Sequence, residues 1–90
     1  MFHVKHIVWT DKALKDKQFL EKINPRLIKR ISQLIEDMTK TPYSGIGKPE
    51  ALKHSFSGFW SRRIDKEHRL IYQYNDLTKT LTLESCKGHY

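Results

Sequence analysis

The sequence predicts an α+β fold in which two N-terminal helices precede a run of strands and cover one face of a sheet. The hydrophobic pattern has a helical period up to about residue 41, and beyond residue 50 the period falls to two. A loop separates the two halves, since residues 42–50 contain two glycines and two prolines. The chain is 90 residues long, so we expect one domain covering residues 1–90.

The first half of the chain contains one expected strand and two expected helices. Residues 4–9 form a β-rich run, and Thr10 is a suitable N-cap for the helix that follows. We expect this helix to bury Ala13, Leu14, Phe19, Leu20 and Ile23. Asn24 as N-cap with Pro25 at the first helical position predicts the start of a second helix, which ends at Thr41. Its apolar stripe consists of Leu27, Ile28, Ile31, Leu34, Ile35 and Met38.

The second half of the chain reads as consecutive strands linked by turns. We expect strands around residues 51–55, 59–64, 68–74 and 80–87. In the third, one face carries Leu70, Tyr72 and Tyr74. In the last, one face carries Leu81, Leu83 and Ser85.

The charge balance indicates an anionic partner. Seventeen Lys and Arg against ten Asp and Glu give a formal net charge of +7, which favours nucleic acid, an acidic protein or an anionic membrane surface. No apolar run is long enough to cross a bilayer, and the N-terminus lacks the features of a signal peptide. The single cysteine, Cys86, suits a reducing compartment, so we expect a cytoplasmic protein.

Motifs for metals and nucleotides are missing from the sequence. It contains no CxxC or HExxH spacing, and Lys48 follows two glycines without the spacing of a phosphate-binding loop. We therefore expect no metal ion and no cofactor.

Cations and aromatic residues alternate in the second half of the chain. The cations are Lys48, Lys53, His54, Arg62, Arg63, His68 and Arg69, and the aromatics are Phe56, Phe59, Trp60 and Tyr72. Such a combination suits single-stranded nucleic acid, because cations neutralise phosphates and aromatic rings stack on bases. A solvated strand face above an ordinary aromatic core would give the same composition, so both interpretations remain open.

A carboxylate and an imidazole could add chemistry to this basic region. Glu50 follows the loop, and His89 and Tyr90 end the sequence. A base, an acid and arginines are sufficient to cleave RNA through its own 2′-hydroxyl. A terminal His-Tyr pair is equally compatible with a frayed tail.

Four segments of the chain resemble the YoeB/Txe toxins, which belong to the RelE-like group. Residues 45–54, GIGKPEALKH, closely resemble the GxGKPExLK motif of that family. The resemblance continues through residues 56–64 and 67–72, and the final residues 86–90, CKGHY, resemble the terminal HY signature. The expected domain is therefore a single YoeB-like toxin domain.

The resemblance implies the toxin of a bacterial type II toxin–antitoxin module. Such a toxin would be a ribosome-dependent mRNA interferase, an endoribonuclease that cuts mRNA in the ribosomal A site and stops translation. The implied fold is a pair of helices on a curved, mostly antiparallel sheet of four to five strands. The implied partners are a YefM-like antitoxin, the bacterial ribosome and its mRNA, operator DNA through the antitoxin complex, and a second copy in a homodimer, with no membrane.

The resemblance also implies roles for particular residues. Glu50 matches the motif carboxylate that acts as general base, and His89 matches the terminal histidine that acts as general acid. Tyr90 matches the tyrosine that positions the phosphate or base, and Arg69 matches the arginine that stabilises the scissile phosphate. A structural ion pair between Glu50 and Arg69 is the alternative for those two residues.

The remaining cations of the motif are expected to contact RNA. Lys53, His54 and Arg63 lie where the family places cations that contact or support the substrate. Arg62 is expected to face outward or to bind ribosomal RNA.

Two other functions on the same fold stay open. One is a gyrase inhibitor like the ParE toxins, and the other is a catalytically inactive module that acts through an antitoxin and operator DNA. Neither would require Glu50 together with His89 and Tyr90, and this sequence has all three.

Overall fold

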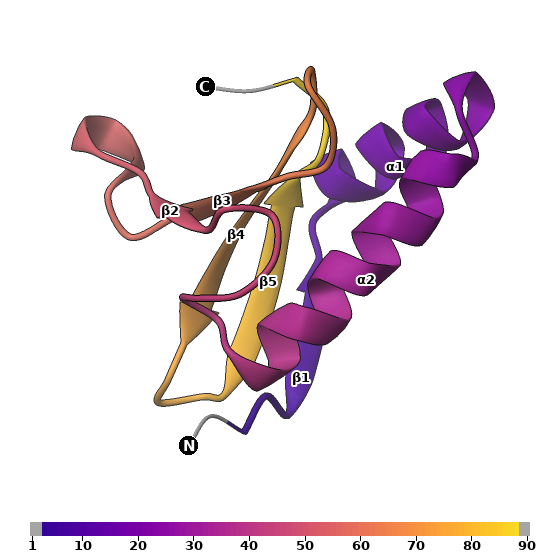
Figure 1. Cartoon of the computed structure of the whole chain (residues 1–90). Coiled ribbons are helices and arrows are strands. Elements are labelled where there is room, and N and C mark those ends of the chain that lie inside the picture. The colour runs from indigo at the N-terminus through magenta and orange to yellow at the C-terminus, as the bar shows by residue number, and fades with distance from the viewer. Residues whose placement is uncertain (1–2, 89–90) are drawn as a thin grey trace.

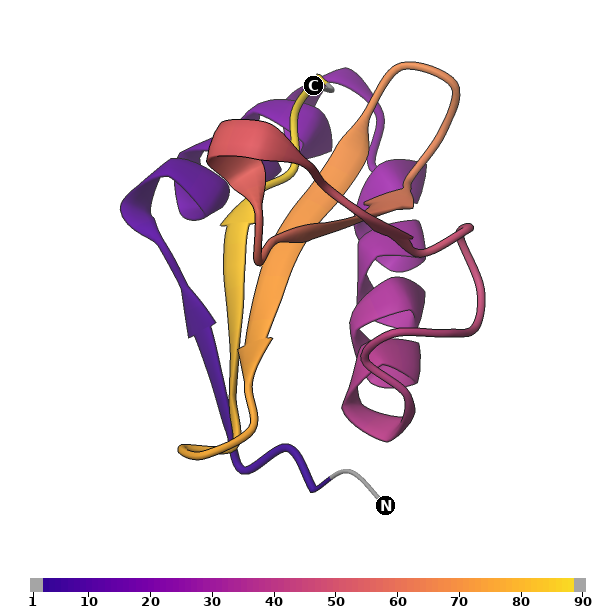
Figure 2. The same ribbon diagram turned by 90° about the vertical axis from the view of Figure 1, so that its left-hand side faces the viewer.

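Two helices cover one face of a five-stranded sheet in the computed structural model, which describes residues 3–88 (Figure 1). The elements are β1 (His6–Trp9), α1 (Asp11–Ile23), α2 (Arg26–Lys40), β2 (Glu50–Ala51), a 3₁₀ helix (His54–Phe56), β3 (Trp60–Arg63), β4 (Arg69–Asn75) and β5 (Thr80–Ser85). Figure 2 views the sheet from its uncovered face, with both helices behind it. The α+β arrangement predicted from the change of period is confirmed.

The sheet has the strand order β1-β5-β4-β3-β2. β1 runs parallel to β5, with His6 opposite Thr80, and the other neighbouring pairs are antiparallel. The expectation of a mostly antiparallel sheet of four to five strands is therefore confirmed. Its first strand lies at one edge, and β2, which carries Glu50, forms the other.

Helix α1 begins as expected but buries a different set of residues. The Thr10 hydroxyl accepts a hydrogen bond from the Ala13 amide at 3.0 Å, which confirms Thr10 as the N-cap. The buried stripe is Ala13, Asp16 and Leu20, which are spaced three and four residues apart. Three of the residues expected in the core are exposed instead: Leu14, Phe19 and Ile23. Asp16 takes the middle of the stripe because the buried Cys86 amide donates to its carboxylate at 3.1 Å.

Helix α2 carries the stripe that the sequence predicts. Its buried residues are Leu27, Ile31, Leu34 and Met38, and Ile28 and Ile35 pack partly buried against the same core. The helix starts at Arg26 with Pro25 as its N-cap, one residue later than expected, and the Asn24 side chain accepts from the Arg26 amide at 3.2 Å just before it. Neither helix of the described chain has the length and apolar character needed to span a bilayer.

The strands agree with the prediction except for the first one after the loop. β3, β4 and β5 lie within or close to the expected segments, and their core faces carry the residues expected there. The expected strand at residues 51–55 is wrong, because β2 ends at Ala51. The chain must reverse toward β3, and His54, with φ of 59°, opens a 3₁₀ turn that makes this reversal.

Candidate active site

A hollow of about 170 Å³ opens between β2, β3 and β4 and holds three of the expected site residues. Glu50 comes from β2, Arg63 from the end of β3 and Arg69 from the start of β4. The rest of the lining is Lys48, Leu52, Ser61 and Ile71. The structure therefore brings the expected base together with two of the expected phosphate-binding cations.

The strand register explains this meeting. Glu50 pairs with Ser61 across β2 and β3, and Arg63 pairs with Arg69 across β3 and β4. Directly opposed side chains on one face of a sheet lie about 4.5–5.5 Å apart at Cβ, so the pairing alone places these groups within reach of one ligand.

The charges of the hollow are unbalanced. It contains one carboxylate and three cations, Lys48, Arg63 and Arg69. Within residues 3–88, Glu50 forms no ion pair, so the alternative of a structural pair with Arg69 is not realised there. Arg69 Nη1 instead donates to the carbonyls of Asp65 at 2.9 Å and His68 at 3.2 Å, which holds its guanidinium at the rim. Such a site is suited to an anion.

Lys53 and His54 lie outside this hollow. They line a neighbouring hollow of about 380 Å³ together with Ser55 and Phe56, and Leu52 belongs to both. The two cations expected to contact RNA are thus adjacent to Glu50 but do not surround the same space.

Arg62 contradicts the expectation that it faces outward. Successive residues of a strand point to opposite faces, so Arg63 reaches the hollow and Arg62 points toward the helices. Its side chain has an exposed fraction of 0%. A buried guanidinium must be paired and hydrogen-bonded, and the fold supplies the partners.

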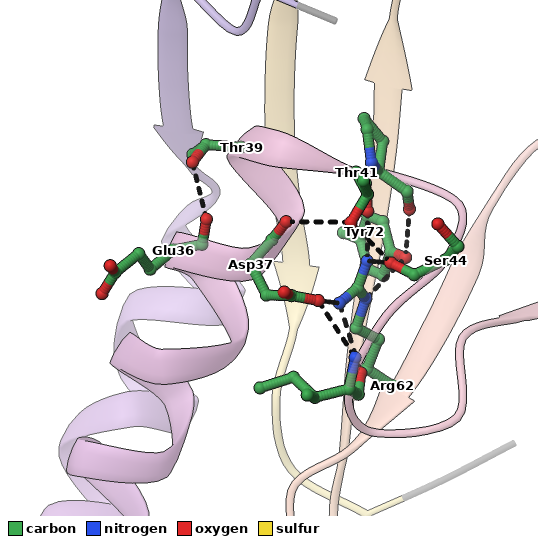
Figure 3. Close-up of polar contacts among 9 residues, drawn as sticks. Glu36, Asp37, Thr39, Thr41, Ser44, Arg62 and Tyr72 are labelled. Atoms are coloured by element: carbon green, nitrogen blue, oxygen red, sulfur yellow. Dashed lines mark hydrogen bonds and ion pairs between the residues drawn. The ribbon is translucent and has the colours of Figure 1, made fainter.

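Arg62 fastens the 41–49 loop to β3 (Figure 3). Nη1 donates to the Asp37 carboxylate at 2.6 Å and to the Ile46 carbonyl at 3.2 Å. Nη2 donates to the carbonyls of Thr41 at 2.6 Å and Ser44 at 2.8 Å. The loop that contains Lys48 and leads into Glu50 is therefore anchored from the core side of the sheet.

Tyr72 and Asp37 complete this network. Arg62 Nε donates to the Tyr72 hydroxyl at 3.1 Å, and that hydroxyl donates to the Pro42 carbonyl at 2.6 Å. Burial raises the pKa of Tyr72, and the adjacent Arg62 opposes this only in part. For Asp37, burial acts to raise the pKa, but hydrogen bonds from Arg62 and the Ile46 amide outweigh it, so its pKa lies below the usual value.

The two glycines of the loop fit this network closely. A Cβ on Gly45 would collide with the Asp37 carboxylate. A Cβ on Gly47 would lie 2.7 Å from Leu34 Cδ2 and 3.2 Å from Arg62 Cβ, and its φ of 80° also favours glycine. The GxG pattern therefore allows close packing over Arg62.

The chain beyond β5 is fastened next to Arg69. The Gly88 amide donates to His68 Nδ1 at 2.9 Å, and the Arg69 amide donates to the Gly88 carbonyl at 2.7 Å. The preceding thiol of Cys86 is buried, which raises its pKa to about 12 and makes it unreactive. The expected catalytic residues His89 and Tyr90 lie outside the described residues.

Two polar members of the hollow, Lys48 and Ser61, have no role in the sequence analysis. Lys48 was counted only among the cations of the region, and Ser61 was not singled out. The period of two could have found Ser61, since it lies two residues before Arg63 on the same strand face. Within the part of the chain that the structure describes, no group of His, Cys, Asp and Glu could hold a metal ion.

Comparison with known proteins gives one consistent family. The family model described as YoeB-like toxin of bacterial type II toxin–antitoxin system matches residues 9–90. The chain is 43% identical over 84 residues to Toxin YoeB of Escherichia coli strain K12, which covers 93% of this chain and 98% of that protein.

Solved structures of similar sequence share the fold. A YoeB/ParE toxin from Agrobacterium tumefaciens matches with a TM-score of 0.90 and 37% identity over 96% of this chain and all of that chain. A YoeB–YefM complex from Staphylococcus aureus matches with a TM-score of 0.83 and 36% identity. The match covers 94% of this chain and 97% of that chain. A YoeB dimer from Staphylococcus aureus matches with a TM-score of 0.86 and 34% identity. The match covers 97% of this chain and 99% of that chain.

Proposed function

The chain belongs to the YoeB-like toxins of bacterial type II toxin–antitoxin systems, and we propose that it is an mRNA interferase that cuts mRNA in the ribosomal A site. As an endoribonuclease it would act only on mRNA presented by the ribosome. The observation that supports this proposal most is the hollow that Glu50 lines together with Arg63 and Arg69, in which Glu50 forms no ion pair with any residue in the described range 3–88. A carboxylate that can accept a proton and cations that can bind a phosphate are two of the three groups that RNA cleavage through the 2′-hydroxyl uses, and the third is a general acid.

Glu50 starts the reaction in this proposal by accepting the proton of the 2′-hydroxyl. The O2′–P bond then forms as the P–O5′ bond breaks, so the RNA ends in a 2′,3′-cyclic phosphate. The departing O5′ takes a proton from the general acid and leaves as a 5′-hydroxyl. Acid–base catalysis of this kind needs no metal ion, and each proton transfer contributes about 10²–10⁴-fold to the rate.

Arg69 stabilises the charge that develops on the phosphate. Its Nη1 is held by two carbonyl acceptors, so the guanidinium needs little reorganisation during the reaction. Arg63, directly opposite in the register, adds a second cation. Lys53 and His54, in the adjoining hollow, contact the RNA on the other side of Glu50.

His89 is the proposed general acid, and Tyr90 is proposed to position the phosphate or the base. The proposal is supported by the sequence position of these residues. Both follow Gly88, whose carbonyl accepts a hydrogen bond from the backbone amide of Arg69, a residue that lines the hollow.

The proposed partners follow from the family and its relatives. A YefM-like antitoxin would inhibit this chain, as suggested by the Staphylococcus aureus YoeB–YefM complex, and the pair would bind operator DNA. Two copies would form a homodimer, as suggested by the Staphylococcus aureus YoeB dimer. The site of action would be the cytoplasm, where ribosomes translate.

A toeprint assay with purified ribosomes and a defined mRNA tests the proposal. We expect cleavage at an A-site codon only when ribosomes are present. Glu50→Gln should slow cleavage by about 10²–10⁴-fold, because the amide cannot accept the proton. His89→Gln should slow it similarly.

Glu36→Gln is the matched control for this experiment. It makes the same chemical change at an exposed carboxylate of α2, outside the hollow, and should cut like the parent. Equal cutting of naked RNA would refute ribosome dependence. Undiminished growth arrest by the Glu50 and His89 variants would refute the catalytic assignment and favour a target other than mRNA, such as gyrase.

A further inference from the structure

A second hollow of about 410 Å³ adjoins the one that holds Glu50. Arg63 and Arg69 line both hollows and so form the ridge between them. The other lining residues of the second hollow are Arg30, Ile64, Asp65 and Lys66. Any strand of RNA bound at the first hollow therefore has a neighbouring basic surface to continue into.

The cations of this second hollow form no ion pair with an acidic residue in the described range 3–88. Among the described residues, no ion pair involves Arg30, Arg63 or Lys66. The one carboxylate present, Asp65, has its Oδ1 occupied by the amides of Glu67 at 2.9 Å and His68 at 2.7 Å. Four cations against one carboxylate leave a net positive surface that an anion would neutralise.

Arg30 reaches this surface only through the tertiary structure. It lies on α2, 33 residues before Arg63 in the sequence (63 − 30 = 33), and is only half-buried. Its sequence neighbour Lys29 lines neither hollow. The second hollow is therefore lined by residues from helix α2, from the end of β3 and from the turn before β4.

We propose that the second hollow binds the phosphate next to the scissile one on the same RNA strand. This inference rests on the proposed function, because it assumes that Glu50 and the two shared arginines hold the scissile phosphate. The adjacent phosphate then sits between Arg30 and Lys66, and a guanidinium can bind it through two hydrogen bonds. These two residues thereby add a subsite that fixes the strand on one side of the cut.

The test compares two ribosome-free ligands whose 2′-hydroxyls are methylated and cannot react. A 2′-O-methyl dinucleotide has one phosphodiester, and the corresponding trinucleotide has two. NMR titration of the full chain at low salt should show that the parent binds the trinucleotide roughly tenfold more tightly. That gain should fall to less than about twofold in the Arg30→Gln/Lys66→Gln variant, while dinucleotide binding stays unchanged.

A charge-matched control uses Lys22→Gln/Lys29→Gln, two exposed lysines that line neither hollow. This control should keep the tenfold gain. A trinucleotide in which one linkage is a neutral methylphosphonate should lose the gain with the parent chain, because the gain comes from the second charge.

Three results would overturn the inference. The first is a gain that survives in the Arg30/Lys66 variant, and the second is a gain that survives the methylphosphonate. The third is unchanged RNA binding with lost antitoxin binding, which would assign the hollow to acidic side chains of a protein. Because the ligands cannot be cut, a chain that shows the gain but never cleaves mRNA contradicts the proposed function and not this inference.

Discussion

Arg62 and Arg63 are adjacent in the sequence, yet their side chains serve opposite faces of the sheet. Arg62 is fully buried and holds the 41–49 loop, whereas Arg63 is exposed and lines both basic hollows. The alternation of side chains along β3 separates them. Substitution of each should therefore affect a different property.

We expect Arg62→Met to lower the free energy of unfolding by about 3 kcal/mol, because it strands the Asp37 carboxylate and several loop carbonyls. Arg63→Gln should change stability by less than about 0.5 kcal/mol and slow cleavage by roughly 10²–10³-fold. Urea unfolding and toeprinting measure the two effects. Equal stability losses in both variants would contradict the assignment.

Asp37 makes the stability depend on acid pH. Its pKa is lowered in the folded chain, so its contribution is fully present above the unfolded value near 3.8 and is lost as pH falls through the folded value. We expect the parent to be more stable than Asp37→Asn at pH 7 and the difference to shrink between about pH 5 and pH 2. Thermal unfolding across this range tests the sign, and a difference that grows toward acid pH would refute it.

At the scale of elements, the 41–49 loop is the connection on which the site depends. It joins α2 to β2, it is bonded to Arg62 from the core side, and the Gly47 carbonyl accepts from the Arg63 amide at 2.7 Å. Lys48 and Glu50 follow immediately. The position of the proposed base is thus set by the packing of its loop.

Gly47→Ala should disturb this loop and the activity together. The added Cβ meets Leu34 and Arg62, and φ is positive, so we expect a loss of about 1–3 kcal/mol in stability and slower cleavage. Gly58→Ala is the control, since its φ of 98° is also positive but no heavy atom lies within 4 Å of the added Cβ. If both variants cleave equally well, the close packing of Gly47 does not matter for the site.

In the whole molecule, part of the net charge of +7 is concentrated in one region of the surface. Helix α2, the 41–49 loop and the β3–β4 hairpin place five cations around two adjoining hollows that hold two carboxylates, with Arg63 and Arg69 between the hollows. The helices cover the opposite face of the sheet (Figure 2). The excess charge is thus available to an anion at the edge that carries Glu50.

Binding to single-stranded RNA should therefore weaken steeply with salt. Two to four phosphate contacts predict a slope of about −1.4 to −2.8 for the logarithm of the association constant against the logarithm of salt concentration. Fluorescence anisotropy with a labelled 2′-O-methyl oligonucleotide measures this slope. Binding that does not change with salt would exclude phosphate recognition.

The local features of this protein could be predicted from its residues alone. The change of period predicted the α+β fold, the regular stripe predicted the core face of α2, and the motif brought forward Glu50, Arg63 and Arg69, which line one hollow. The period and the apolar stripe depend on residues that are near one another in the chain, so local patterns record them directly.

Which charged groups are buried, and which of them lie together, depends on contacts between segments that are distant in the chain. Arg62 is in the core because Asp37, 25 residues away, pairs with it, and Asp16 is buried because the Cys86 amide donates to it. Arg30 and Arg63 line one hollow although they are far apart in the sequence. The cost of burying a charge depends on partners that are distant in the chain, and no local pattern specifies them.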